Sequence, residues 1–218
     1  MGWGLAAYAA GVVALTWAES RSTSWQGLLK PLLALGFVAT GAYVLWTVEG
    51  AGVSGLDTVF GAYARLIFAG LVACAAGDIL LLRKGTGAAF VAGMAAFGLG
   101  HALLAWAFLQ LGDVGTIPIW LWPLWGLLLA FGLQALRGAE RRLRPAIAVY
   151  VGLITFMVFA AGMTGTWLVW PALAFAVSDL FVAQNRFAAP EPWHPLAITP
   201  LYFGAQMAFA LSPLLLTL

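Results

Sequence analysis

The sequence predicts an all-α integral membrane protein, with residues 1–218 forming a single helical transmembrane domain. Of the 218 residues, 63% are hydrophobic and 8% are charged, and the mean hydropathy is +0.98. A soluble domain usually carries about 25% charged residues. Ten Lys and Arg against eight Asp and Glu give a net charge of +2, which is too weak and too scattered for a nucleic-acid-binding surface. The single cysteine excludes an internal disulfide framework.

Eight apolar runs approach the roughly 20 residues that a helix needs to cross a bilayer. The first run has no Lys or Arg before it, so we expect a retained helix rather than a signal peptide. The connections between runs are too short to hold a soluble domain. The runs cover residues 2–18, 28–47, 59–82, 87–110, 116–135, 145–163, 166–184 and 198–217.

Basic residues mark every second connection, and this distribution predicts the orientation of the chain. The opposite connections carry Glu49, Asp57 and Asp113 and no Lys or Arg. We therefore expect both termini on the non-cytoplasmic side. Arg65, inside the third run, is expected to extend toward the lipid headgroups. The other nine basic residues are Arg21, Lys30, Arg83, Lys84, Arg137, Arg141, Arg142, Arg144 and Arg186.

The two halves of the chain share a spacing. Asp78 lies late in the third run, and Asp179 lies late in the seventh. His101 follows Asp78 by 23 residues, and Tyr202 follows Asp179 by the same interval. We infer a 4+4 parallel internal repeat, of the kind that some membrane folds contain. Coincidence between apolar helices of low sequence diversity is the alternative.

Asp78 and Asp179 are acidic residues inside predicted membrane helices that are otherwise apolar. An aspartate at the centre of a membrane helix costs roughly 2.5–3.5 kcal/mol on insertion, so such residues usually face a cavity and have a function. The helical rise places Asp78 about 7.5 Å before Arg83 and Asp179 about 10 Å before Arg186. We therefore predict that they meet in one cavity opening toward the cytoplasmic leaflet. A buried structural pair is the alternative.

Two carboxylates at one site repel each other, so one keeps its proton and the pair divides into acid and base. Lys30 or Arg186 would keep the second carboxylate ionised. The arrangement suits general acid–base hydrolysis and, equally, a small proton-coupled membrane transporter. A lipid-binding or assembly protein without turnover, in which the aspartates only pair with Lys30 and Arg186, is a third hypothesis.

Further polar side chains are predicted to bind the substrate, and all of them except His101 share the depth of the aspartates. His101 lies about 22 Å into its helix, deeper than the aspartates, where it lines the cavity or bonds a neighbouring helix. No Ser–His–Asp triad is expected, because Ser178 lacks a GxSxG context and points away from Asp179. No HExxH or Asp-rich run predicts a metal site. The predicted binding residues are Lys30, His101, Tyr150, Ser178, Arg186, Tyr202 and Gln206.

Several short motifs, in this order and spacing, resemble the YhhN/TMEM86 family of integral membrane lysoplasmalogenases. The resemblance covers roughly residues 28–210. The family often has an aromatic residue soon after its Gly-His pair, whereas this chain reads Ala102-Leu103-Leu104, which leaves the fine shape of the pocket open. The motifs are Lys30-Pro31, Gly77-Asp78-Ile79-Leu80-Leu81, Gly100-His101, Ser178-Asp179-Leu180, Arg186-Phe187, and Tyr202 with Ala205-Gln206.

The resemblance implies hydrolysis of the vinyl ether bond of a lysoplasmalogen, which gives a fatty aldehyde and glycerophosphoethanolamine or glycerophosphocholine. It implies Asp78 and Asp179 as catalytic acid and base, with no metal or organic cofactor. We expect Asp179 to be the base, because Arg186 lies two turns away. The expected partners are the lysophospholipid and membrane lipids, with no nucleic acid, and the oligomeric state is open. The expected location is the bacterial inner membrane.

Overall fold

The computed structural model describes residues 2–50, 59–83, 85, 87–112, 117–187 and 191–216. Within these ranges the chain is all-helical, and each of the eight predicted runs corresponds to one long helix. A short 3-10 helix, η2 (Arg141–Leu143), precedes α6. The long helices are α1 (Gly2–Ser20), α2 (Gln26–Gly50), α3 (Val59–Leu81), α4 (Ala88–Leu111), α5 (Leu121–Gly138), α6 (Arg144–Met163), α7 (Val169–Phe187) and α8 (His194–Leu215).

Five of the described helices are long and apolar enough to cross a membrane: α2, α3, α4, α6 together with η2, and α8. The described helices α1, α5 and α7 are shorter, at 19, 18 and 19 residues. The chain is therefore an integral membrane protein, as its composition predicts.

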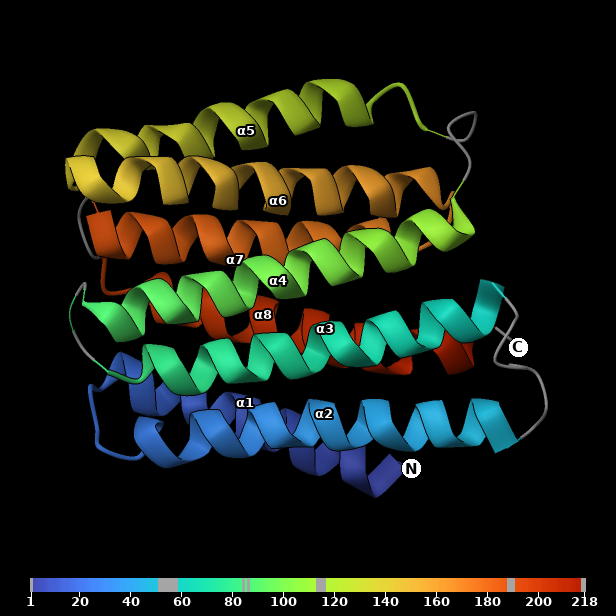
Figure 1. Ribbon diagram of the computed structural model, residues 1–218. Helices are drawn as coiled ribbons and strands as arrows, with labels where there is room; N and C mark the ends of the chain where they lie inside the picture. Colours follow the sequence, from blue (N-terminus) through green and yellow to red (C-terminus); the bar gives the residue numbers. More distant parts are fainter. Residues whose placement is uncertain are drawn as a thin grey trace.

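The helices lie side by side along one axis, and both ends of the chain lie at the same end of the bundle (Figure 1). Helices α5, α6 and α7 lie on one side, and α1, α2 and α3 lie on the other. Helix α4 contacts α3 and α6, whereas α8 contacts α7 and also α1, α2 and α3. The fourth helix of each half thus packs against the second helix of the other half, which joins the two halves into one bundle.

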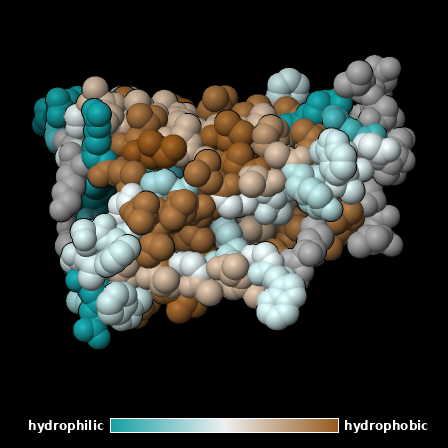
Figure 2. All heavy atoms as spheres, turned by 90° about the horizontal axis from the view of Figure 1, so that it is seen from below, coloured by the Kyte–Doolittle hydropathy of each residue, from teal (hydrophilic) through white to brown (hydrophobic). Residues whose placement is uncertain are grey.

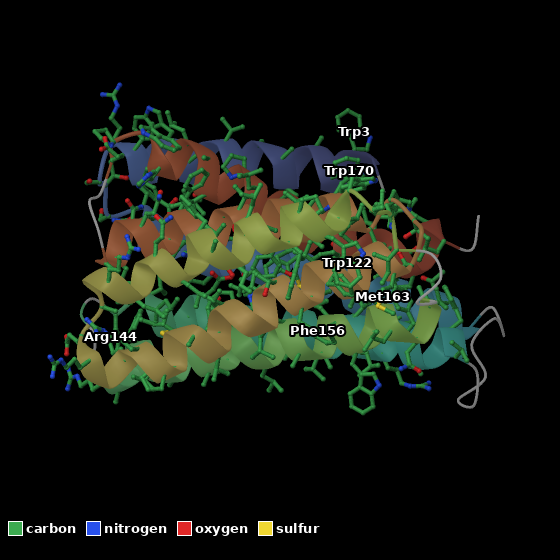
Figure 3. The ribbon with its side chains drawn as sticks, turned by 90° about the horizontal axis from the view of Figure 1, so that it is seen from above. Trp3, Trp122, Arg144, Phe156, Met163 and Trp170 are labelled. Atoms are coloured by element: carbon green, nitrogen blue, oxygen red, sulfur yellow. The ribbon has the colours of Figure 1, made fainter. Side chains whose placement is uncertain are left out.

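Polar residues gather at the ends of the bundle, and apolar residues cover its middle (Figure 2). Arg144 lies at one end, and Met163 and Trp170 lie at the other (Figure 3). At the end with the chain termini, Arg65 Nη1 lies 3.6 Å from Glu49 Oε1, so this arginine has a protein partner as well as a route to the headgroups. The predicted orientation residues Asp57, Lys84 and Asp113 lie outside the described residues.

The start of α8 differs from the predicted boundary. The helix begins at His194 rather than at residue 198, and Pro195 occupies its first turn. Proline is favoured there because its fixed φ suits a helix and its missing N–H would have no intrahelical partner. A search for apolar runs misses the first turn of α8, which contains a histidine. The start of α6 at Arg144, next to Pro145, agrees with the predicted start to within one residue.

Helices α3 and α4 approach closely through small residues, and this contact places His101. A Cβ atom at Gly100 would lie 2.5 Å from Cys74 Sγ and 3.3 Å from the carbonyl oxygen of Gly70. Gly77 is equally tight, because a Cβ atom there would lie 2.5 Å from the Phe97 ring. Small residues at such contacts let membrane helices pack backbone to backbone. Gly100 therefore sets the distance between α4 and α3 next to the histidine.

We predict that Gly100→Ala destabilises the bundle by about 1–3 kcal/mol, because the added methyl group overpacks a rigid contact. Gly152→Ala on α6 is the matched control, since a Cβ there meets no atom within 4 Å. Thermal unfolding in detergent should show a Tm several degrees lower for Gly100→Ala only. Equal melting temperatures for the two variants would contradict the close packing of α3 and α4.

Candidate active site

The structure brings most of the predicted polar residues into one cavity near the basic end of the bundle. The cavity measures about 70 Å³. A single water needs roughly 10–15 Å³ on this measure, so several waters fit. Apolar residues of α3, α4, α7 and α8 complete the walls. The polar lining residues are Lys30, Asp78, Tyr150, Ser178, Asp179 and Tyr202, from five different helices.

Asp78 is buried with a cation beside it. Its exposed fraction is 1%, and the Tyr202 hydroxyl donates a hydrogen bond of 2.6 Å to Oδ2. Lys30 Nζ lies 3.7 Å from Oδ1. The Lys30 side chain is 28% exposed, so its stem runs along the helices while the ammonium reaches the carboxylate. Both carboxylate oxygens therefore face a polar partner, and one partner carries a positive charge.

Asp179 has two partners on the same oxygen. The Tyr150 hydroxyl donates to Oδ2 at 3.0 Å, and His101 Nε2 lies 3.0 Å from the same atom. The sequence places His101 deeper than the aspartates when residues are counted along a straight helix. In the structure α4 is inclined across the bundle (Figure 1), and His101 bonds α7 directly.

The surroundings of His101 indicate where its protons lie. The ring is fully buried, and its Nδ1 lies 3.4 Å from Met157 Sδ. A thioether sulfur accepts hydrogen bonds but donates none, so Nδ1 is assigned the N–H. The contact between Nε2 and Asp179 then contains one proton, held either by the carboxyl group or by the imidazole. Asp179 and His101 together therefore form a proton-carrying pair beside the cavity.

The contacts of the aspartates cross between the two halves. Asp78 on α3 bonds Tyr202 on α8, and Asp179 on α7 bonds His101 on α4. Each aspartate thus bonds the residue that lies 23 positions after the other aspartate. Equivalent positions thus make equivalent contacts, each with the opposite half of the chain.

Three predicted residues do not bond the aspartates, and two of them, Arg186 and Ser178, bond backbone carbonyls instead. Arg186 donates a 2.9 Å hydrogen bond to the Gly85 carbonyl, and its guanidinium lies over the Phe90 ring at 4.6 Å. It lines a neighbouring cavity of about 60 Å³ that also reaches Asp179, but it forms no ion pair with either aspartate in the described part of the chain. Arg186 therefore does not contact Asp179 directly, and its effect on that carboxylate stays a prediction. Ser178 donates its hydroxyl to the Phe175 carbonyl at 2.7 Å.

Gln206 is fully buried one turn beyond Tyr202 on α8. Neither its amide oxygen nor its amide nitrogen makes a hydrogen bond of ordinary geometry to the described residues. A buried amide without a partner carries a desolvation cost, and such groups commonly bind internal water or a ligand. Gln206 therefore remains available to a polar molecule in the interior.

The sequence gives no signal for the residues that orient His101. Met157 contacts Nδ1, and Phe175 packs on the ring with a centroid distance of 4.6 Å. Both lie among other apolar residues, and no spacing distinguishes them from lipid-facing neighbours. Across the described ranges, no group of three or more His, Cys, Asp or Glu side chains is arranged to hold a metal ion.

Comparisons with known proteins give one consistent result. The YhhN family model matches residues 50–213. Lysoplasmalogenase TMEM86B of Homo sapiens is 34% identical over 204 residues, covering 91% of this chain and 80% of the relative. Lysoplasmalogenase TMEM86A of Bos taurus is 35% identical over 214 residues, with coverages of 90% and 81%. Lysoplasmalogenase TMEM86A of Homo sapiens is 33% identical over 208 residues, with the same coverages. No solved structure matches significantly.

Gln206→Met is expected to raise the free energy of unfolding by about 1 kcal/mol, because it removes a buried amide that makes no hydrogen bond of ordinary geometry to the described residues. Ser212→Ala is the control on the same helix. Its hydroxyl lies 2.6 Å from the Tyr63 hydroxyl, so its removal should destabilise the protein. Unfolding curves of both variants test this difference. An equal loss of stability in Gln206→Met would show that the amide is bonded within the protein.

Proposed function

The chain belongs to the YhhN family, and from that premise we propose that it hydrolyses the vinyl ether bond of lysoplasmalogens. The products would be a fatty aldehyde and glycerophosphoethanolamine or glycerophosphocholine. The observation that carries the proposal is that Asp78 and Asp179 line one cavity, large enough for several waters, and have different partners. The names of the curated relatives favour hydrolysis over a proton-coupled transporter.

The reaction begins with an acid. A vinyl ether resists base, but a proton added to its β-carbon gives an oxocarbenium ion. We assign this proton to the Asp179–His101 pair, in which one proton lies between Oδ2 and Nε2. The Tyr150 hydroxyl, bonded to the same oxygen, stabilises the negative charge that remains on Asp179 when the proton leaves.

Asp78 is then the base. The Lys30 ammonium at 3.7 Å favours its ionised form, and a carboxylate stabilises the neighbouring oxocarbenium ion. A cavity water attacks the cationic carbon and gives a proton to Asp78, which yields a hemiacetal. The hemiacetal collapses to aldehyde and alcohol, and the proton that Asp78 took returns to the Asp179–His101 pair. This assignment reverses the expectation that Asp179 is the base.

The polar rim of the site would hold the substrate headgroup. Lys30 and Arg186 lie at the basic end of the bundle and offer ammonium and guanidinium donors for a phosphate. Gln206 would bind a cavity water or a glycerol hydroxyl. No step requires a metal or an organic cofactor.

We further propose that the basic end faces the cytoplasm, by the preference of Lys and Arg for that side. All eight helices then cross the membrane, both termini are non-cytoplasmic, and the site opens to the cytoplasmic leaflet of a bacterial inner membrane. The polar residues that lower the apolarity of α7 include Asp179 itself. The crossed contacts of Asp78 and Asp179 support a 4+4 parallel repeat.

Asp78→Asn and Asp179→Asn should each lower kcat by at least about 10²-fold, the smaller limit for losing a general acid or base. The measurement is aldehyde release from a 1-alkenyl lysophospholipid by the purified protein in detergent. Glu49→Gln, the same kind of change at the opposite end of the bundle, should retain activity. Substantial turnover by either folded aspartate variant would refute the two-carboxylate mechanism.

Cleavage in D₂O should place one deuterium on carbon 2 of the aldehyde, because the acidic proton of the Asp179–His101 pair exchanges with solvent. Immediate trapping of the aldehyde as an oxime and mass spectrometry measure the label. Unlabelled aldehyde incubated in D₂O with Asp179→Asn controls for later exchange. An unlabelled product from the wild type would mean that the β-carbon is not protonated in the reaction.

A further inference from the structure

A groove runs between α4 and α6 on the outside of the bundle. It encloses about 490 Å³ and is apolar except for one side chain, Tyr150. The lining residues on α4 are Val91, Met94, Ala95, Gly98, Leu99 and Ala102. Those on α6 are Pro145, Ala146, Val149, Tyr150 and Leu153.

Tyr150 joins this groove to the candidate active site. Its side chain lines the groove and also the cavity that contains both aspartates, and its hydroxyl bonds Asp179. Met94 likewise lines both the groove and the neighbouring cavity with Arg186. A ligand in the groove would therefore lie against the ring whose hydroxyl contacts the proposed acid.

We infer that this groove binds the single aliphatic chain of the lysolipid substrate and admits it sideways from the membrane. The inference rests on the proposed function and adds the location of the chain. The first carbons of the chain, with the vinyl ether, would lie by Tyr150, and the rest of the chain would lie along the groove between α4 and α6. From Val91 to Ala102 the helical rise gives the groove a length of about 16 Å along α4.

The way in which the other helices cover the bundle supports this choice. Helix α4 packs on α6, and α8 packs on α2, so the two seams occupy equivalent places in the two halves. Helix α1 covers the α2–α8 seam, because it contacts both helices, and its Tyr8 hydroxyl donates to the Phe203 carbonyl. Helix α5 instead contacts α6 and α7 at the edge of the bundle (Figure 1), so it leaves the α4–α6 seam open.

A second outer cavity provides a control. It lies among α1, α2 and α8, measures about 390 Å³, and is lined in part by Tyr8, Ala39 and Met207. None of its lining residues belongs to the cavity that contains the aspartates. A lipid chain bound there would not reach the carboxylates, so the two cavities distinguish specific binding from general contact with lipid.

The test uses a 1-alkyl lysophospholipid, which lacks the vinyl bond and is not cleaved, with a photoreactive diazirine at the end of its chain. Labelling of the purified protein followed by peptide mapping should place the label on α4 and α6. Ala102→Phe and, separately, Ala95→Phe should reduce labelling roughly tenfold, since small steric changes in apolar pockets have effects of that order. Ala39→Phe, the same change in the control cavity, should leave labelling unchanged.

Labelling that falls mainly on α1, α2 and α8, or that persists in both folded groove variants, would overturn the inference. Aldehyde release from the 1-alkenyl lipid is measured on the same preparations. Groove labelling without aldehyde release would support the binding site and refute the proposed reaction. Aldehyde release without groove labelling would refute the binding site and leave the proposed reaction standing.

Discussion

The structure depends on the need to give each buried carboxylate its partners inside a membrane protein. A carboxylate away from water is tolerated only where hydrogen bonds and opposite charge replace hydration. Asp78 takes its partners from α2 and α8, and Asp179 takes its partners from α4 and α6. Helices α3 and α7 carry the aspartates, so six helices in all contribute to the contacts of these two side chains. The exchange of partners between the halves follows, because the fourth helix of each half must reach the aspartate of the other.

The same requirement makes the two carboxylates chemically different. Asp78 faces a primary ammonium group, whereas Asp179 contacts an imidazole that is itself held by Met157 and Phe175. Pairs of like groups in unlike surroundings are how enzymes obtain an acid and a base from one residue type. The internal spacing of the sequence is symmetric around the aspartates, but their surroundings are not. Each aspartate accepts from a tyrosine, so the proposed division of roles rests on Lys30 of α2 beside Asp78 and His101 of α4 beside Asp179.

Sequence reasoning reaches the fold class, the helices and most of the cavity because these depend on composition and on depth along a helix. Depth alone selects Lys30, Tyr150 and Tyr202, and all three line the cavity with the aspartates. The depth of a residue along its helix does not show which neighbouring helix its side chain contacts. The count along the helix leaves open whether His101 lines the cavity or bonds a neighbouring helix, and the structure shows the bond to Asp179; Arg186, two turns from Asp179 in sequence, bonds the Gly85 carbonyl. The crossed pairing is tertiary, and a sequence interval carries no information about it.

A hydrolase in a membrane must bring water and an aliphatic chain to the same carbon atoms by separate routes. In this bundle the polar route is the cavity that Lys30 lines, with the buried amide of Gln206 further along α8, and the apolar route is the groove between α4 and α6. Tyr150 lies where the routes meet, with its ring in the groove and its hydroxyl on Asp179. A bond next to a polar headgroup and at the start of an apolar chain would come to rest at this boundary. In a lysoplasmalogen the vinyl ether lies between the glycerol and the aliphatic chain, so it would lie at this boundary. Water from the cavity and the chain from the groove would then meet at this bond.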